Sequence, residues 1–406
     1  MSGTARTPGL RVGLIGLGSM GRHHARVIRA TEGMDLVAVA DPGGDRFGVA
    51  GELEPLPDVA ALIDVGLDAA VVAVPTVHHE RVALALAEAG VPTMVEKPIA
   101  HSVDAGRRVA DAFASRGLVG AVGYVERCNP ALRELRHRLD AGELGQVYQV
   151  LTRRQGPFPA RISDVGVVKD LATHDIDLTS WVADSPYRAI SAQVAHRSGR
   201  ENEDMVVANG VLANGVIVSH TVNWLTPFKE RVIIVTGEKG ALVADTLTGD
   251  LTFHANGTVA STWDQVANFR GVTEGDVIRY AIAKREPLAL EQEHFRDAVL
   301  GTGSSAATMA DGVTTLTVVE AVLASAAGDR TVERGGPCRG ASRPWCSGRS
   351  ALRRRSRSAV GAVAPPPTRS ALREWCSRPA CTPPSRPRPR SGSTGWRAPW
   401  PGAAPR

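Results

Sequence analysis

The spacing of apolar and polar residues changes along the chain and predicts two kinds of architecture. Up to about residue 125, short apolar runs alternate with stretches in which apolar residues recur every three or four positions. The runs predict buried strands, and the stretches predict helices. This alternation is typical of βαβ units and predicts a Rossmann fold with a doubly wound parallel sheet. The predicted strands are 10–16, 36–40, 69–74, 93–95 and 118–122, and the predicted helices are 19–30, 77–89 and 103–115.

Beyond that point the sequence predicts a largely antiparallel sheet with one face toward solvent or a partner. Asn214-Gly215 is the clearest hairpin turn, because this pair favours the positive φ angles of two-residue turns. The predicted strands are 147–154, 189–196, 205–212, 216–223, 231–236 and 241–245, and the predicted helices are 129–140, 291–300 and 306–326. We therefore expect an α/β protein with a Rossmann domain over 1–125. A second α/β domain over 126–333 is expected to contain an open, mostly antiparallel sheet.

Residues 334–406 differ from the rest in composition. They hold 16 arginines, no lysine and one acid, Glu374, which gives this tail a net charge of +15 and leaves −10 for residues 1–333. The basic charge is therefore no sign of nucleic-acid binding by the body of the protein. Because the tail has no apolar periodicity, we expect disorder. A basic arm for nucleic acid or membrane and an out-of-frame translation are the alternative hypotheses.

Cysteine use and hydropathy favour a cytoplasmic protein. Four of the five cysteines lie in the tail at spacings that match no zinc motif, and Cys128 stands alone in the body. The first residues lack the apolar segment of a signal peptide, and no apolar run reaches the roughly 18 residues of a membrane span. We expect no membrane attachment and, for lack of a cluster with ligand spacing, no metal.

The segment Gly16-x-Gly18-x-x-Gly21 follows a predicted strand and opens a predicted helix. In that context the first glycine permits a tight turn, the second lets the backbone approach a pyrophosphate, and the third allows close packing. Asp41 ends the next strand, where its carboxylate can accept from both ribose hydroxyls and repel a 2′-phosphate. This favours NAD over NADP, although Arg46 is close enough in sequence to serve a 2′-phosphate.

Two further segments carry candidate chemistry. Lys97 follows a predicted strand and is expected at the carboxyl edge of the parallel sheet, where it can stabilise a developing alkoxide. Asp170, His174 and Asp177 have the spacing of one helix face. His174 suits a general base, Asp170 can orient it or the substrate, and Asp177 can bind a sugar hydroxyl. The alternative interpretation of Lys97 is a surface lysine on a loop. For the helix, the alternative is that Asp170, Asp177 and the nearby Asp175 are solvated surface acids and that His174 is a packed histidine. His23, His24, His78 and His79 are interpreted as structural, with an approach of His79 to the nicotinamide side as the alternative.

These three motifs, in this order, give residues 10–330 a resemblance to the Gfo/Idh/MocA family of oxidoreductases. The resemblance implies an N-terminal domain that binds NAD and a C-terminal domain whose open sheet forms dimers or tetramers. It also implies Lys97, Asp170 and His174 as the catalytic group. We expect the cofactor to contact Gly16, Gly18, Ser19, Met20, Gly21, Asp41, Pro75, Glu96 and Lys97.

Within the family, residues 129–147, 153–177 and 223–231 resemble the branch that oxidises UDP-N-acetylglucosamine at C3. This implies a nucleotide-sugar substrate and arginines that bind its diphosphate or its sugar. The expected substrate contacts are Lys97, Arg154, Arg161, Asp170, His174, Asp177 and Trp224, with Arg153 and Asn223 as further candidates. A solvated basic strand and a tryptophan packed in the sheet are the alternatives.

The leading hypothesis is thus an NAD-dependent dehydrogenase that oxidises a ring hydroxyl of a nucleotide sugar, with C3 favoured. A dehydrogenase of a free polyol such as an inositol, or of another nucleotide's sugar, is the second hypothesis. A dinucleotide-binding regulator would bind the cofactor without turnover. Binding of DNA or RNA by the tail would be steeply salt-dependent.

Overall fold

The N-terminal strands form the expected parallel sheet in the computed structural model, which describes residues 9–159, 165–257, 275–303 and 305–333. The sheet order is β3-β2-β1-β4-β5-β6 with all pairs parallel, which is the Rossmann order. The last four residues of β1 are buried, as expected of a strand covered on both faces. The strands are β1 (Leu10–Ile15), β2 (Met34–Ala40), β3 (Pro55–Leu56), β4 (Ala69–Val72), β5 (Thr93–Glu96) and β6 (Gly120–Gly123).

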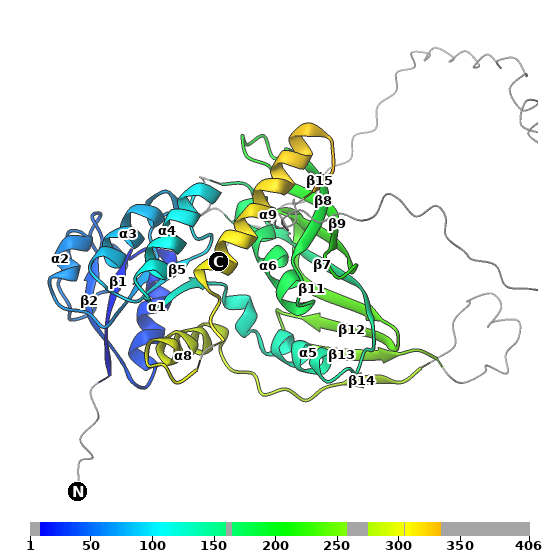
Figure 1. Cartoon of the computed structure of the whole chain (residues 1–406), viewed down its shortest axis with the longest axis horizontal. Helices are drawn as coiled ribbons and strands as arrows, with labels where there is room; N and C mark the ends of the chain where they lie inside the picture. The colour runs from blue at the N-terminus through cyan, green and yellow to red at the C-terminus, as the bar shows by residue number, and fades with distance from the viewer. Residues whose placement is uncertain (1–8, 160–164, 258–274, 304, 334–406) are drawn as a thin grey trace, which may run out of the picture. The chain divides into compact units, whose positions relative to one another are not determined.

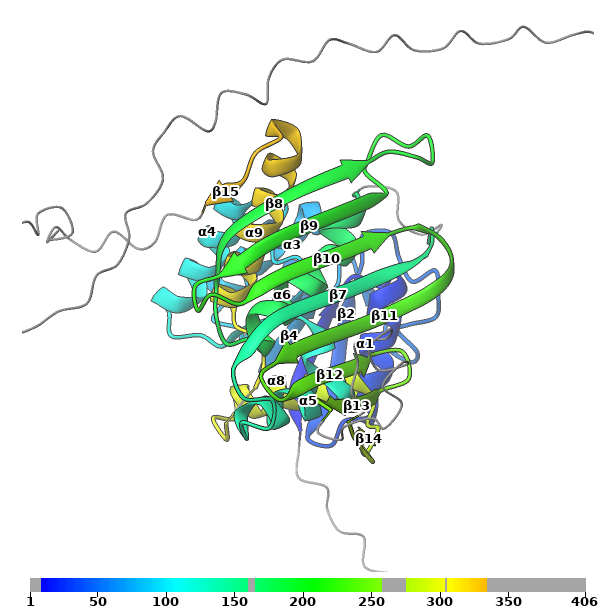
Figure 2. The ribbon, with the colours of Figure 1, turned by 90° about the vertical axis from the view of Figure 1, so that its right-hand side faces the viewer.

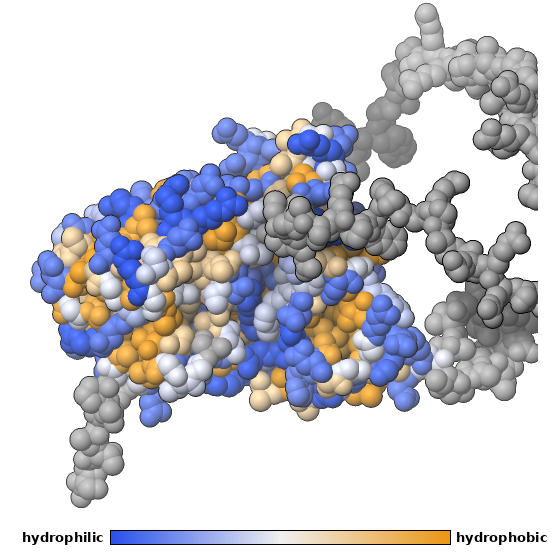
Figure 3. All heavy atoms as spheres, in the orientation of Figure 1, coloured by the Kyte–Doolittle hydropathy of each residue, from blue (hydrophilic) through white to orange (hydrophobic). Residues whose placement is uncertain are grey.

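Amphipathic helices connect these strands (Figure 1). In α4, the buried Val103, Val109 and Phe113 face the sheet, whereas Arg107 and Arg108 lie outside. Figure 3 shows this outer face as hydrophilic. Ser102 caps α4 by accepting a hydrogen bond from the Ala105 N–H. The helices are α1 (Ser19–Ala30), α2 (Val59–Ile63), α3 (His79–Glu88) and α4 (Val103–Ser115), with a short 3₁₀ turn, η1 (Thr76–His78), before α3.

The second sheet is mostly antiparallel, as predicted. Its order is β14-β13-β12-β11-β7-β10-β9-β8-β15, and only β10 and β7 run parallel. Asn214-Gly215 connects β9 to β10 with a Gly215 φ of +91°, which confirms the predicted hairpin. The strands are β7 (Val147–Pro157), β8 (Tyr187–Ala195), β9 (Met205–Leu212), β10 (Ile217–Asn223), β11 (Leu225–Gly237), β12 (Gly240–Asp245), β13 (Asp250–Ala255), β14 (Val277–Arg279) and β15 (Val332–Glu333).

Helices cover one face of this sheet. In Figure 2 the sheet faces the viewer, and α5 (Pro130–Asp140), α6 (Thr173–Val182) and α9 (Met309–Gly328) lie behind it. The period of two along β7 buries Val150 and Thr152 against the helices and turns Arg153 outward. Among the described residues, no helix covers the outward face.

The chain returns to the Rossmann sheet after the second sheet. α8 (Pro287–Val299) packs against α1, where Arg296 donates to the Glu32 carbonyl oxygen at 2.7 Å. Thr308 forms an isolated bridge with Ala121 of β6. The boundary expected near residue 125 therefore separates the two sheets but does not separate the helices that pack on them.

The sequence pattern misses the shortest elements. β3 has two residues and β14 three, which is too few for a periodicity to be visible. β11 begins at Leu225, before the expected residue 231, because an irregular register between Leu225 and Glu230 hides the alternation. The tail over 334–406 lies outside the described residues, so its expected disorder is still a prediction.

α9 is the one helix among the described residues that is long and apolar enough to cross a membrane, on length and composition alone. Leu316, Val319 and Val322 of this helix are buried in the hydrophobic core. A capping box of Thr308 and Asp311 fixes its first turn. A core helix has the same composition as a membrane span, and α9 packs as a core helix.

Candidate active site

The turn between β1 and α1 has the shape of a phosphate cradle. Gly16 has a φ of +95°, and a Cβ on Gly21 would lie 1.9 Å from the Gly16 carbonyl oxygen. A Cβ on Gly18 would meet nothing within 4 Å, so space is open at that position. No side chain of the described residues caps α1, and its first turn holds no acid. The positive end of this helix can therefore face an anion, and the residues present fit a dinucleotide pyrophosphate.

Asp41 lies beside the cradle. Its Oδ2 accepts a hydrogen bond from the Leu17 N–H and its Oδ1 accepts one from the Gly43 N–H, both at 2.8 Å. Each oxygen keeps a further lone pair for a ribose hydroxyl. A cavity of about 260 Å³ opens here, lined in part by Asp41, Asp58, Pro75, His78 and Arg81. This arrangement fits the adenosine side of NAD.

Adding a methyl group should affect Gly18 and Gly21 in different ways. We expect Gly18→Ala to unfold at the wild-type temperature, because its Cβ meets no atom, but to bind NAD at least about tenfold more weakly, since the methyl occupies the pyrophosphate space. Gly21→Ala should instead lose about 1–3 kcal/mol of stability or more, because its Cβ would overlap a carbonyl oxygen. Thermal unfolding and NAD titration of both variants check this. Wild-type NAD affinity in Gly18→Ala would contradict the cradle.

A second cavity, of about 290 Å³, brings the three sequence motifs together. Its wall is formed by the start of α1, the loop after β4, the turn after β5 and the segment that enters α6. Among its lining residues are Met20, Pro75, Glu96, Lys97, Asp170 and His174. The cavity lies at the carboxyl ends of the parallel strands, where Rossmann folds bind ligands.

Lys97 and Asp170 form an ion pair in this cavity. Lys97 follows β5 and precedes Pro98 through a cis peptide bond. Its Nζ donates to the Asp170 carbonyl oxygen at 2.8 Å and to Oδ1 at 3.0 Å, and the two side chains are 17% and 6% exposed. Since an ammonium group has three protons, one is left for a substrate oxygen.

Asp170 and His174 each present a buried atom without a protein partner. Asp170 lies on a π-helix, η3 (Val168–Ala172), that runs directly into α6, so the expected single helix is a π-turn followed by an α-helix. Among the described residues, Asp170 Oδ2 and His174 Nδ1 have no hydrogen-bond partner. Each such atom costs about 1–3 kcal/mol of folding free energy, a cost that a ligand can recover. Both atoms are therefore candidates for contact with a bound molecule.

The surroundings of His174 keep its imidazole neutral. Burial lowers the pKa of His174 well below its ordinary value, and the positive charges of Lys97, Arg154 and Arg231 lower it further. The neutral ring is the form that accepts a proton, so His174 is available as a base at neutral pH.

Glu96 connects the Lys97 turn to α1 and α8. Its Oε2 accepts from the Lys97 N–H at 3.1 Å, and its Oε1 accepts from His24 Nε2 at 2.8 Å. Gln292 donates to His24 Nδ1 at 2.9 Å, which leaves the His24 proton on Nε2. Burial opposes the Glu96 charge, but His24 and Lys97 outweigh it and lower the pKa of Glu96 below its ordinary value. Sequence reasoning missed this role of His24, because 72 residues separate it from Glu96.

Asp177 corrects one expectation, because it contacts protein groups and does not line the cavity. Its two oxygens accept from Arg127 Nη2 at 2.6 Å and Nε at 2.8 Å, and Thr315 donates to Oδ1 at 3.2 Å. The residue is 1% exposed. The π-turn over 168–172 adds a residue to one turn, so a position seven residues after Asp170 no longer shares its face. Asp177 therefore braces α6 in the core.

Arg154 is also engaged within the protein. It lies on the inward face of β7 and is 4% exposed. Its Nε donates to Asp175 at 2.9 Å and its Nη1 to Glu126 at 2.7 Å. Arg153 points to the outward face of the sheet and pairs with Glu230 at 2.9 Å. The expected diphosphate contact of Arg154 is thus corrected to a buried charge network. This network surrounds Asp175, which the sequence suggested as plain surface charge.

Trp224 is packed in the sheet, as the alternative interpretation held. It is 4% exposed, and its ring meets Phe158 edge to face at a centroid distance of 5.3 Å. Arg200 lies over the Trp224 ring at 5.2 Å. Its indole Nε1 has no hydrogen-bond partner among the described residues, so the expected contact of Trp224 with substrate is still a prediction. Arg161, the remaining arginine of the expected substrate set, lies outside the described residues.

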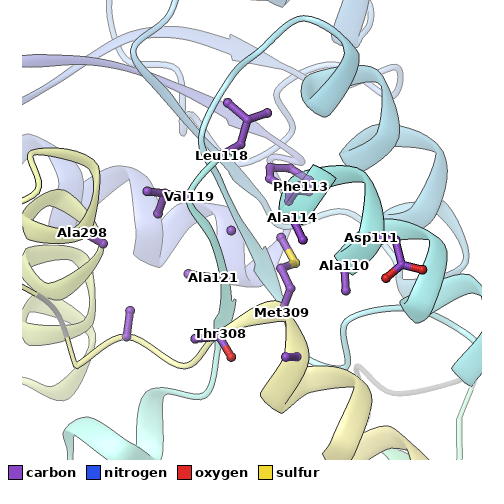
Figure 4. Close-up of a pocket in the computed structure, with 13 residues that line it drawn as sticks. Ala110, Asp111, Phe113, Ala114, Leu118, Val119, Ala121, Ala298, Thr308 and Met309 are labelled. Atoms are coloured by element: carbon purple, nitrogen blue, oxygen red, sulfur yellow. The ribbon is translucent and has the colours of Figure 1, made fainter. Parts of the chain in front are cut away.

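A larger cavity of about 500 Å³ lies elsewhere, between α4, β6 and the start of α9 (Figure 4). Phe113, Leu118 and Met309 give it an apolar wall, and its polar side chains are Asp111 and Thr308. Thr308 is committed to the α9 cap. This cavity lacks the acid, base and cation that the Lys97 cavity combines. Within the described residues, no group of three or more His, Cys, Asp or Glu side chains is arranged to hold a metal.

Comparison with known proteins agrees with this geometry. A family model described as an oxidoreductase family with an NAD-binding Rossmann fold matches residues 10–124, and the GFO/IDH/MocA C-terminal domain matches 132–243. The chain is 30% identical over 293 residues to UDP-N-acetylglucosamine 3-dehydrogenase of Acidithiobacillus ferrooxidans, a match that covers 71% of this chain and 88% of that protein. It is 35% identical over 196 residues to Inositol 2-dehydrogenase 4 of Saccharopolyspora erythraea, which covers 45% of this chain and 57% of that protein.

Among solved structures, UDP-N-acetylglucosamine 3-dehydrogenase GnnA from Acidithiobacillus ferrooxidans superposes with a TM-score of 0.70 at 26% identity. The superposition covers 79% of this chain and 98% of that one. Both expected architectural features, the parallel Rossmann sheet and the mostly antiparallel second sheet, are confirmed. The chain belongs to the Gfo/Idh/MocA family of oxidoreductases, NAD-binding dehydrogenases that act on hydroxyl groups.

Proposed function

We propose that this enzyme oxidises the 3-hydroxyl of a nucleotide sugar such as UDP-N-acetylglucosamine to the 3-keto sugar. The observation that carries the proposal is the UDP-N-acetylglucosamine 3-dehydrogenase match, which covers 88% of that relative. It is supported by the open position at Gly18 and by the Lys97–Asp170 pair beside His174 in one cavity. NAD held against the cradle, Asp41, Pro75, Glu96 and Lys97 supplies the hydride acceptor.

The residues of the cavity divide the remaining work. His174, held neutral, takes the proton of the substrate hydroxyl. The third Nζ proton of Lys97 hydrogen-bonds the same oxygen and stabilises the alkoxide as it forms. Asp170 holds Lys97 through Oδ1 and accepts a substrate hydroxyl with its unpaired Oδ2. Lys97, the donor to the reacting oxygen, is thus held in place before the substrate binds.

A free polyol is the second candidate substrate. It is favoured by the 35% identity to Inositol 2-dehydrogenase 4, although that match spans 57% of the relative. The same three residues would serve either substrate, since each reaction removes a proton and a hydride from one CH–OH group. The two candidates differ in the groups that hold the rest of the molecule.

We further propose that the enzyme is a cytoplasmic homodimer or homotetramer associated through the outward face of the nine-stranded sheet. Ile217, 58% exposed, lies on that face, because it is paired with Gln149 of β7 and precedes the buried Val218 of β10. Sedimentation of the purified chain reports its oligomeric state, and a monomer would contradict this proposal.

The substrate is tested by following reduced nicotinamide with the full-length chain and NAD. We expect turnover with UDP-N-acetylglucosamine and none with N-acetylglucosamine or myo-inositol. Turnover of myo-inositol alone would replace the nucleotide-sugar proposal by the polyol alternative. NAD binding without turnover of either class would favour a regulator.

A further inference from the structure

Lys169 is a second lysine at the Lys97 cavity, and it has no carboxylate partner among the described residues. It precedes Asp170 on η3 and lines the same cavity. Its side chain is half-buried, and its Nζ donates to the His101 carbonyl oxygen over a long 3.4 Å. Sequence reasoning passed over this residue because its neighbour Asp170 carried the motif.

The carboxylates that line the cavity are paired with groups other than Lys169. Lys97 is balanced by Asp170, with Nζ 3.0 Å from Oδ1. Glu96 is bound to His24 and to the Lys97 N–H. The two lysines and two carboxylates of the lining balance formally, but no carboxylate of the described residues lies within 4.0 Å of Lys169 Nζ, which uses one of its three protons. A half-buried cation attracts an anion more strongly than an exposed one, because less water screens it.

Two of the arginines that were candidates for an anionic ligand, Arg153 and Arg154, have partners within the protein, whereas Arg161 lies outside the described residues. Arg153 pairs with Glu230, and Arg154 lies between Asp175 and Glu126. Arg231 donates to the carbonyl oxygens of Gln155 and Glu230. Among the described residues that line the cavity, Lys169 is thus the cation left for a ligand.

We infer that Lys169 binds the diphosphate of the nucleotide-sugar substrate. Asp170, the next residue, contacts the sugar under the function proposed above, on which this inference rests. The one helical turn then holds both parts of the substrate, with Asp170 at the reacting sugar and Lys169 at its phosphates. A neutral polyol offers no partner for Lys169, so the residue selects for the anionic class.

The test compares Lys169→Gln with the wild-type chain. We expect KM for UDP-N-acetylglucosamine to rise about ten- to a hundredfold, the range for a lost hydrogen bond to a charged group, with kcat and the NAD affinity within about twofold. Lys169→Arg keeps the charge and should restore most of the affinity. Lys239→Ala is the matched control, because Lys239 also donates to a carbonyl oxygen, that of Gly142, and does not line the cavity.

A binding measurement separates this inference from the proposed function. UDP is titrated into the NAD-loaded wild-type chain and Lys169→Gln by calorimetry. Weaker UDP binding in the variant supports the inference even if the wild type turns over a different nucleotide sugar. Unchanged UDP affinity and KM in Lys169→Gln overturn it while leaving the proposed function intact. If the wild type neither binds UDP nor oxidises UDP-N-acetylglucosamine, the inference and the proposed function are both wrong. A loss confined to NAD affinity would assign Lys169 to the cofactor and also overturn it.

Discussion

Replacing Lys97 by Met is expected to lower kcat about a thousandfold while the NAD dissociation constant changes less than about twofold. The loss is that of a preorganised donor to a developing oxyanion, which is typically worth about 10²–10³ in rate. Lys97 Nζ is held by two acceptors of Asp170 at 2.8 and 3.0 Å, so its remaining proton is aimed before substrate arrives. Stopped-flow detection of reduced nicotinamide and an NAD titration measure the two quantities.

A control is needed because Lys97→Met also leaves the Asp170 carboxylate, 6% exposed, without its partner. Removing one member of a buried pair destabilises a protein more than removing both. We therefore expect Lys97→Met to lower the melting temperature and Lys97→Met with Asp170→Asn to recover much of it. The double variant should stay as inactive as the single one. Recovery of activity together with stability would show that Lys97 is structural.

Replacing His174 by Asn is expected to lower kcat about 10²–10⁴-fold, the usual contribution of a general base. Asn is close in shape and keeps a polar group in the cavity, so NAD affinity and the unfolding temperature should change little. His174 Nδ1 is already without a hydrogen-bond partner among the described residues, so the substitution breaks no bond there. A kcat within threefold of wild type would remove His174 from the mechanism.

The pH dependence gives a second readout for the same residue. Burial and the charges of Lys97, Arg154 and Arg231 lower the pKa of His174, so the active neutral ring persists below pH 6.5, the ordinary value for histidine. The acid limb of kcat/KM in the wild type should therefore lie below that pH, and His174→Asn should lose it. An acid limb above pH 6.5 would contradict the assigned environment of the imidazole.

Local periodicity predicted most of the secondary structure. α1 and α4 have the predicted bounds, and β9 does as well. These elements are long or bounded by strong turn residues, so short-range patterns determine them. β3, β14 and the first part of β11 were missed, because two or three residues or an irregular register leave no pattern to read.

The sequence by itself also determined the order of three motifs, and with it the family and the cofactor. The same motifs predicted the Lys97–Asp170–His174 group, whose residues line one cavity in the structure. Each motif is short, and its chemistry depends on residues that are neighbours in the chain or one helical turn apart. Such short-range relations can be recognised in a sequence, because the strand before Lys97 determines where Lys97 lies and the glycines before α1 determine where the helix begins.

Only the tertiary structure decided which charged side chains face the cavity and which face each other. Asp177 is as polar as Asp170, yet it is paired with Arg127 in the core. Arg154 is as polar as Lys169, yet it is paired with Glu126 and Asp175 in the core. His24 and Gln292 reach Glu96 from distant parts of the chain. A charged residue can be satisfied by a ligand or by a partner far away in sequence, and the choice depends on packing between elements. That packing is not encoded in any local pattern, so it became visible only in the folded chain that Lys169 has no carboxylate partner among the described residues.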